Sequence, residues 1–324
     1  MEKNNFNNFN NFNNFAILTC LTISIVTAFI YFDRIEMDLY EIIKSRHDVL
    51  VDFNGTDNAP FKYRILSPII IEFLQIFLKL FFNEKISFQL SYILLNTFSI
   101  FAFTTLCFFY FKKYFKNSTS IIGVLLIGIL INVHLKDLFI VATILDASFL
   151  VLALLLIKNQ KYYWLLPLLV FAGLNRETSI LIIVIFFIKL IFLKEIKKKN
   201  ILLFFYLILT YIFIFISLRY FLGPAEHMSL SSEDHFLLAI FLWNIKLEYF
   251  LYALFLYFIF FGFLWIYVIS GFKKLNYELR ENYLILLFYL PLIWVFGSWY
   301  ETRLLIPMFS IVIPSLLAFY DNTK

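Results

Sequence analysis

Four short polar clusters interrupt a chain whose other segments are mostly hydrocarbon. They span residues 33–38, 60–64, 175–178 and 299–303, and each contains ionisable side chains. Charged groups in or beside a bilayer are costly, so clusters that can meet on one side of a membrane are candidates for a functional site. In such a site a carboxylate can activate a hydroxyl group, and a guanidinium group can bind a phosphate.

The first cluster supplies the candidate acids. Asp38 stands directly before residues 39–43, a stretch typical of the start of a short amphipathic helix on the bilayer surface. We expect Asp38 to act on an acceptor hydroxyl as a base or hydrogen-bond acceptor, with Asp33 and Glu36 as the other candidates. An acid in the first turn of a helix can equally be an ordinary cap.

The candidate phosphate ligands lie in the other three clusters. Arg64 comes just before a helix start at Ser67-Pro68, and it is preceded by Lys62 and the supporting aromatic Tyr63. Its planar fork can bind two phosphate oxygens at once, and the free N–H groups of the following helix would assist. The alternative is that Lys62 and Arg64 only reach toward lipid headgroups.

Arg176 and Arg303 are the further candidates for a phosphate. Glu177 follows Arg176 directly, and adjacent side chains on a helix diverge by about 100°, so these two cannot pair well. We therefore expect Arg176 to find another partner, such as Asp137 or Glu301, and we assign Glu177 and Glu301 supporting roles. A purely structural network between helices is the alternative.

No motif indicates a metal site. The four histidines are scattered without the spacing of metal ligands, and the sequence has no glycine-rich phosphate loop. The sequence therefore predicts no metal ligands; a divalent cation could still take part, but no residue pattern indicates one.

Composition predicts a polytopic membrane protein. Hydrophobic residues make up 62% of the chain and charged residues 15%, whereas soluble domains carry about 25% charged residues. Residues 201–222 lack the alternation of a barrel strand, so the fold class is all-α. The net charge of +5 comes largely from lysines beside apolar segments, which is a topology signal and not a nucleic-acid surface.

We count eleven apolar segments. They cover approximately residues 15–32, 68–82, 88–111, 119–133, 138–157, 162–174, 178–193, 201–222, 248–270, 283–298 and 304–319. Basic turns belong in the cytoplasm, so we expect the lysine-rich turns between these segments to be cytoplasmic. Alternation of the crossings then places the polar clusters on the non-cytoplasmic side.

Segment 68–82 is the one that we expect not to cross. Its length corresponds to about 22 Å of helix, which is short of the roughly 30 Å hydrocarbon core. Without this crossing, the loop 33–67 joins the other polar clusters on the outer side. We predict about ten transmembrane helices with one or two interfacial or re-entrant helices.

The domain organisation follows from these segments. We expect a disordered Asn/Phe-rich stretch at 1–14, one transmembrane domain at 15–319 with outer loops 33–67 and 223–247, and a cytoplasmic tail at 320–324. Pro307 and Pro314 predict a kink in the last helix.

The order of these features resembles the GT-C fold membrane glycosyltransferases. The resemblance lies in Asp38-Leu39-Tyr40 after a first membrane helix, in residues 60–68, in 174–178 and in 301–307. Similar proteins include the bacterial dolichyl-phosphate-mannose mannosyltransferase-like and aminoarabinose transferase-like families.

The resemblance implies a function. The donor would be a sugar on a polyprenyl phosphate, and the acceptor a glycan, lipid or protein hydroxyl on the non-cytoplasmic side of a bacterial inner membrane. Asp38 would be the acid at the acceptor, and Arg64, Arg176 and Arg303 would contact the lipid phosphate. Nucleic acid is not an expected partner.

Three other classes compete with this interpretation. A transporter or lipid-linked sugar flippase is favoured by Asp146, which stands alone within an apolar segment. A polysaccharide polymerase would use a large outer loop with arginines, but the loop 223–247 has none. A non-catalytic scaffold would pair its charges internally and have no open cavity.

Overall fold

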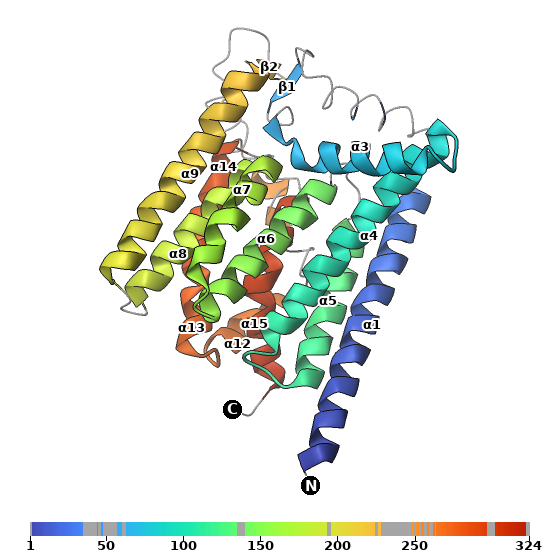
Figure 1. Ribbon diagram of the computed structural model, residues 1–324. Helices are drawn as coiled ribbons and strands as arrows, with labels where there is room; N and C mark the ends of the chain where they lie inside the picture. Colours follow the sequence, from blue (N-terminus) through green and yellow to red (C-terminus); the bar gives the residue numbers. More distant parts are fainter. Residues whose placement is uncertain are drawn as a thin grey trace.

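The structure is a computed structural model, and it describes residues 2–34, 63–134, 140–192, 196–223, 264–296 and 302–321, with residues 44, 47, 57–59, 226–227, 246, 248, 250–252, 254–255, 258 and 262. The described part is a bundle of helices (Figure 1). The elements are α1 (Glu2–Arg34), β1 (Asp57–Ala59), α3 (Leu66–Leu78), α4 (Glu84–Phe111), α5 (Asn117–His134), α6 (Ile140–Lys158), η2 (Tyr162–Trp164), α7 (Leu165–Asn175), η3 (Glu177–Ser179), α8 (Ile180–Phe192), α9 (Lys198–Leu222), β2 (Glu226–His227), α12 (Leu264–Phe272), α13 (Tyr277–Glu281), α14 (Tyr283–Phe296), η4 (Thr302–Met308) and α15 (Phe309–Tyr320).

The helical class is confirmed, as is the presence of segments suited to a membrane. Within the described residues, 4 helices are long and apolar enough to cross a bilayer: Phe12–Ile30, Glu84–Phe111, Lys198–Leu222 and Arg303–Tyr320. Extended structure in the same residues amounts to the short parallel pairing of β1 with β2. This pairing joins the segment between α1 and α3 to the segment that follows α9.

The apolar core surrounds α6 and α15. In Arg303–Tyr320, 89% of the 18 residues are buried, whereas only 17% of an 18-residue apolar stretch within Lys198–Leu222 is buried. Helix α15 is therefore an interior helix, and α9 is a peripheral one. The exposed residues of this peripheral helix are mostly apolar. Contact of such a surface with water is unfavourable, so we expect lipid to surround it.

The two ends of the bundle differ in chemistry. Figure 1 shows the turns α4–α5, α6–α7, α8–α9 and α12–α13 at one end, together with the C-terminus. Lysines belong to each of these turns or to the ends of the helices beside them, including Lys112, Lys158, Lys197 and Lys274. The start of α3, the α7–η3 turn and η4 lie at the opposite end (Figure 1). This is the separation that the basic turns predict.

Helix α3 runs across the end of the bundle and not along it (Figure 1). It is a 13-residue helix in contact with α4 and α7. It is one of the apolar helices that are shorter than a membrane span. Behind it, Asn83 caps α4 by accepting a hydrogen bond from the Ile86 N–H at 2.9 Å. This cap extends α4 to Glu84, four residues before the apolar run at 88.

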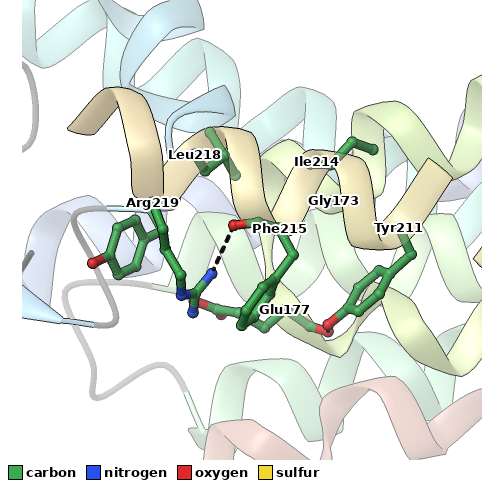
Figure 2. A pocket seen from close by; sticks show the side chains of 8 residues that line it. Gly173, Glu177, Tyr211, Ile214, Phe215, Leu218 and Arg219 are labelled. Carbon is green, nitrogen blue, oxygen red and sulfur yellow. Dashed lines mark hydrogen bonds between the residues drawn. The ribbon is translucent and has the colours of Figure 1, made fainter. Parts of the chain in front are cut away.

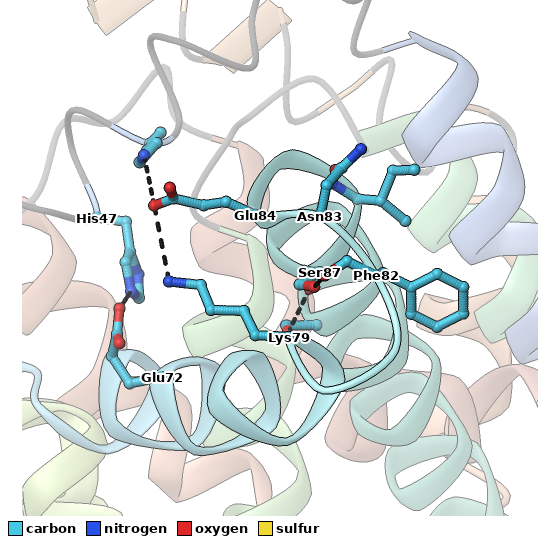
Figure 3. A network of polar contacts seen from close by, with 10 residues as sticks. His47, Glu72, Lys79, Phe82, Asn83, Glu84 and Ser87 are labelled. Carbon is cyan, nitrogen blue, oxygen red and sulfur yellow. Dashed lines mark hydrogen bonds and ion pairs between the residues drawn. The ribbon is translucent and has the colours of Figure 1, made fainter.

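A polar network holds two residues of the segment between α1 and α3 against α3 and α4 (Figure 3). Lys44 donates to Glu84 at 3.0 Å, and Lys79 lies 3.7 Å from the same carboxylate. The buried ring of His47 is 2.8 Å from the Glu72 carboxylate. These contacts hold Lys44 and His47 at the end of the bundle opposite the lysine-rich turns.

Two details differ from the sequence-based expectations. Helix α1 begins at Glu2, whereas we expected disorder over residues 1–14. No Pro or Gly interrupts the first 34 residues, and Asn13 accepts a hydrogen bond from Lys112 at 2.6 Å, so the helix can continue past the apolar run. In the last segment, Pro307 lies in the 3-10 helix η4, so α15 itself begins at Phe309 and contains Pro314.

Candidate functional site

Three arginines from distant parts of the sequence come together at the end of the bundle that carries the polar clusters. Arg64 precedes α3, Arg176 lies between α7 and η3, and Arg303 lies in η4. Burial lowers the pKa of Arg64 to about 10; the charge of Glu177 opposes this shift, and the positive charges of Arg176 and Arg303 add to it. The guanidinium groups of Arg176 and Arg303 are thus close enough to that of Arg64 to repel it.

The backbone at Arg176 explains how it enters this cluster. Its φ of −165° and ψ of 149° are extended, so α7 ends at Asn175 and the 3-10 turn η3 starts at Glu177. Arg176 and Glu177 therefore do not share a helix. Arg176 is 6% exposed. Its Nη1 donates to Thr143 Oγ1 at 3.0 Å, and its Nε is buried without a hydrogen-bond partner.

Asn175 fixes the turn against two other helices. It accepts a hydrogen bond from Ser67 Oγ in α3 at 3.2 Å and donates to the Ala142 carbonyl of α6 at 2.8 Å. Both Ser67 and Asn175 are buried. The start of α3, which carries Arg64, is thereby held beside the turn that carries Arg176.

Glu177 is the acidic partner of Arg64. The Arg64 Nε lies 3.4 Å from Glu177 Oε2 in a partly buried ion pair. The other carboxylate oxygen, Oε1, is buried without a hydrogen-bond partner. Tyr211 of α9 donates to the Glu177 carbonyl at 3.0 Å, which holds the turn against α9.

Asp146 belongs to the same cluster. It accepts a hydrogen bond from Thr178 Oγ1 at 2.6 Å and interacts electrostatically with Arg176 and Arg64. In the sequence analysis, Asp146 only favoured a transporter, because it is the one charged residue within its apolar segment. Thr143 and Asp146 are three residues apart on α6, a spacing that places both on one helix face and would have predicted a shared partner.

Several predicted site residues lie outside the described residues. These are Glu36, Asp38, Lys62 and Glu301, together with Asp137, the other expected partner of Arg176. Asp33 lies in α1, but its side chain is also outside what the structure describes. Their roles stay predictions. Tyr63 is described, and its hydroxyl donates to the Gly223 carbonyl after α9 at 3.1 Å.

The cluster combines guanidinium and carboxyl groups. Within the described residues it contains three guanidinium groups and two carboxyl groups. Arg176 also keeps a buried N–H group without an acceptor, and such groups normally have one in native proteins. An arrangement of this kind can bind an anion with several acceptor oxygens, such as a phosphate. In the same described residues, no group of three His, Cys, Asp or Glu side chains could hold a metal ion.

Comparisons with known proteins give no match for this chain, whether with protein families, with curated proteins or with solved structures.

Proposed function

We propose that this chain is a multi-pass inner-membrane glycosyltransferase with about ten spans in a GT-C-like arrangement. It would move a sugar from a polyprenyl phosphate to an acceptor hydroxyl of a glycan, lipid or protein on the non-cytoplasmic side. The observation that carries the proposal is the meeting of Arg64, Arg176 and Arg303 at the end of the bundle opposite the lysine-rich turns.

The chemistry assigns each group a task. The bond between the anomeric carbon of the sugar and the phosphate oxygen breaks, and a bond to the acceptor oxygen forms. Asp38 takes the proton of the acceptor hydroxyl, and polyprenyl phosphate leaves as a dianion. The three arginines, with Lys62, stabilise the charge that develops on this phosphate. Glu177 and Glu301 position the arginines, and Tyr63 supports the loop.

The test is loss of transfer without loss of fold. Purified protein in liposomes is given polyprenyl-phosphate mannose or polyprenyl-phosphate aminoarabinose with a radiolabelled sugar, together with extracted envelope glycans and lipids. We expect Asp38→Asn to abolish transfer and Arg176→Gln to raise the KM for the donor. Arg280→Gln, at the lysine-rich end, serves as a matched control. Full transfer by Asp38→Asn would remove the catalytic assignment.

The second candidate is a transporter or flippase of lipid-linked sugars. The observation that favours it is a second group of buried charges at the lysine-rich end, where Lys189 pairs with Glu281 at 3.1 Å. Carriers use charged groups along their path. Movement of a labelled lipid-linked sugar across the liposome membrane, with no new glycosidic bond, would identify this function instead.

A further inference from the structure

Four exposed lysines lie where α7 and α9 begin, at the lysine-rich end of the bundle (Figure 1). Lys161 precedes η2 and α7, and residues 197–199 are three lysines at the start of α9. We call these four lysines the basic patch. Because α9 is long and apolar enough to cross a bilayer, we expect its first residues at a membrane surface.

Packing between α7 and α9 brings the two parts of the basic patch to a similar depth. Tyr211 of α9 donates to the Glu177 carbonyl, just after α7, at 3.0 Å (Figure 2). Lys161 stands sixteen residues before Glu177, and Lys197 stands fourteen residues before Tyr211. At a rise of about 1.5 Å per residue, both lysines lie roughly 21–24 Å from this contact along their helices. The patch can therefore contact one headgroup layer of a bilayer.

Few acids stand near the basic patch in the sequence, and this count includes every residue of the two turns. Residues 158–164 contain no acid, and residues 194–199 contain four lysines and one acid, Glu195. The two glutamates within residues 273–281 each pair with a lysine of another helix. The patch is thus positively charged and suits an anionic partner.

Exposed aromatic side chains lie beside the basic patch. Tyr163 and Trp164 follow Lys161, and Trp164 is 65% exposed. On α9, Phe205 and Tyr206 are exposed in the second turn beyond the lysines. Trp and Tyr prefer the headgroup level of a bilayer, and lysine side chains extend from apolar surroundings toward headgroups. Such a surface can contact the headgroup and the acyl chains of one lipid.

The position of the basic patch favours a lipid over a protein as its partner. Only 17% of an 18-residue apolar stretch of α9 is buried, so we expect lipid along this helix. We propose that the basic patch binds the headgroup phosphate of an anionic phospholipid such as phosphatidylglycerol, with the acyl chains against Phe205 and Tyr206. The basic turns also determine topology, but topology alone predicts no enrichment of one lipid at this place.

The experiment measures which lipid surrounds Trp164. The full-length protein is placed in nanodiscs of phosphatidylcholine and phosphatidylglycerol in a fixed ratio. Bromine atoms, which quench tryptophan fluorescence, are carried by the acyl chains of one lipid or of the other. The chain has five tryptophans, so the signal of Trp164 is the difference between the wild type and Trp164→Phe. We expect phosphatidylglycerol to be enriched about fivefold over its bulk fraction, because one lysine near an anionic lipid contributes about that factor.

Two charge-matched variants test the location of the site. Replacing the three lysines at 197–199 by glutamine should leave an enrichment of about twofold or less. The combined variant Lys113→Gln, Lys273→Gln and Arg280→Gln removes three exposed charges elsewhere at the same end and should keep the wild-type enrichment. Arginine at 197–199 should also keep it, and high salt should lower it in the wild type.

Equal quenching of Trp164 by the two brominated lipids in the wild type would overturn the proposal, and this comparison needs no lysine variant. An equal loss of enrichment in both charge-matched variants would also overturn it, because the cause would then be the positive charge of the whole end. A variant with a lowered melting temperature is set aside, and the wild-type comparison decides. The readout requires no sugar transfer, so its result is independent of the proposed function.

Discussion

The charge on Glu177 provides the sharpest test of the arginine cluster. Glu177→Gln keeps the shape of the side chain and removes the negative charge 3.4 Å from Arg64. The pKa of Arg64 is lowered to about 10, chiefly by burial; the charge of Glu177 opposes this shift, and the positive charges of Arg176 and Arg303 contribute to it. In the variant, Asp146 would be the remaining carboxyl group of the cluster among the described residues.

The magnitude follows from Coulomb's law. At an effective dielectric constant of about 20, a charge removed from ~7 Å away changes the energy of a bound anion by about 2 kcal/mol, or roughly 30-fold in affinity. Breaking a fully buried ion pair costs about 3–5 kcal/mol. Because the Glu177 side chain is 29% exposed, we expect a smaller loss of unfolding free energy, about 1–3 kcal/mol. The variant should therefore be less stable and bind phosphate more tightly.

The assay is thermal unfolding of the purified protein in detergent, with and without inorganic phosphate. Glu177→Gln should have a lower melting temperature than the wild type, and added phosphate should raise it more than it raises that of the wild type. Glu84→Gln, at an exposed ion pair with Lys44, is the control and should show neither effect. An unchanged melting temperature together with unchanged phosphate affinity would refute the placement of an anion site here.

Three further predictions concern the scaffold. A Cβ at Gly271 would lie 1.7 Å from a backbone oxygen of α15, so Gly271→Ala should cost about 1–3 kcal/mol of unfolding free energy by denaturant titration, whereas alanine at the exposed Ser270 should cost little. Lys189→Met leaves a buried glutamate of α13 without its cation; we expect a loss of about 3–5 kcal/mol, and a stable variant would contradict it. Cysteines at Lys85 and Lys274, at opposite ends of the bundle, should react with an impermeant reagent from opposite sides of the membrane; labelling of both from one side would refute the topology.

The sequence predicted the positions of the helices well because apolar runs and polar turns are local signals. The turn at 175–177 was expected between two short segments, and it lies between α7 and α8 with only η3 intervening. The start of α4 was missed because it depends on the side chain of Asn83, which extends the helix beyond the apolar run. Disorder at 1–14 was expected from composition alone. Composition does not show that the helix of the following apolar run extends toward the N-terminus through these residues.

The partners of the site residues could not be predicted in the same way. Arg176 was expected to need a partner, and Thr143 supplies one. That choice depends on how far α6 is rotated about its axis, which the whole core determines and which no local pattern records. Arg219 was not among the predicted site residues; it lies near the end of an apolar segment, where a lone cation is usually a membrane anchor. Its contact with Tyr63 joins the end of α9 to a residue shortly before α3, which no local sequence pattern predicts.

The balance of charge separates the two polar ends of the bundle. At the lysine-rich end, Lys158 pairs with Glu278 and Lys189 with Glu281, so two cations meet two carboxylates. Unpartnered buried atoms occur at both ends, Glu281 Oε1 among them, and so hydrogen bonding alone does not distinguish the ends. At the other end, three arginines meet two carboxyl groups within the described residues. The arginine end also contains the buried Arg176 Nε, which has no hydrogen-bond partner, so we expect an added anion to bind there and not at the paired buried charges of the lysine-rich end.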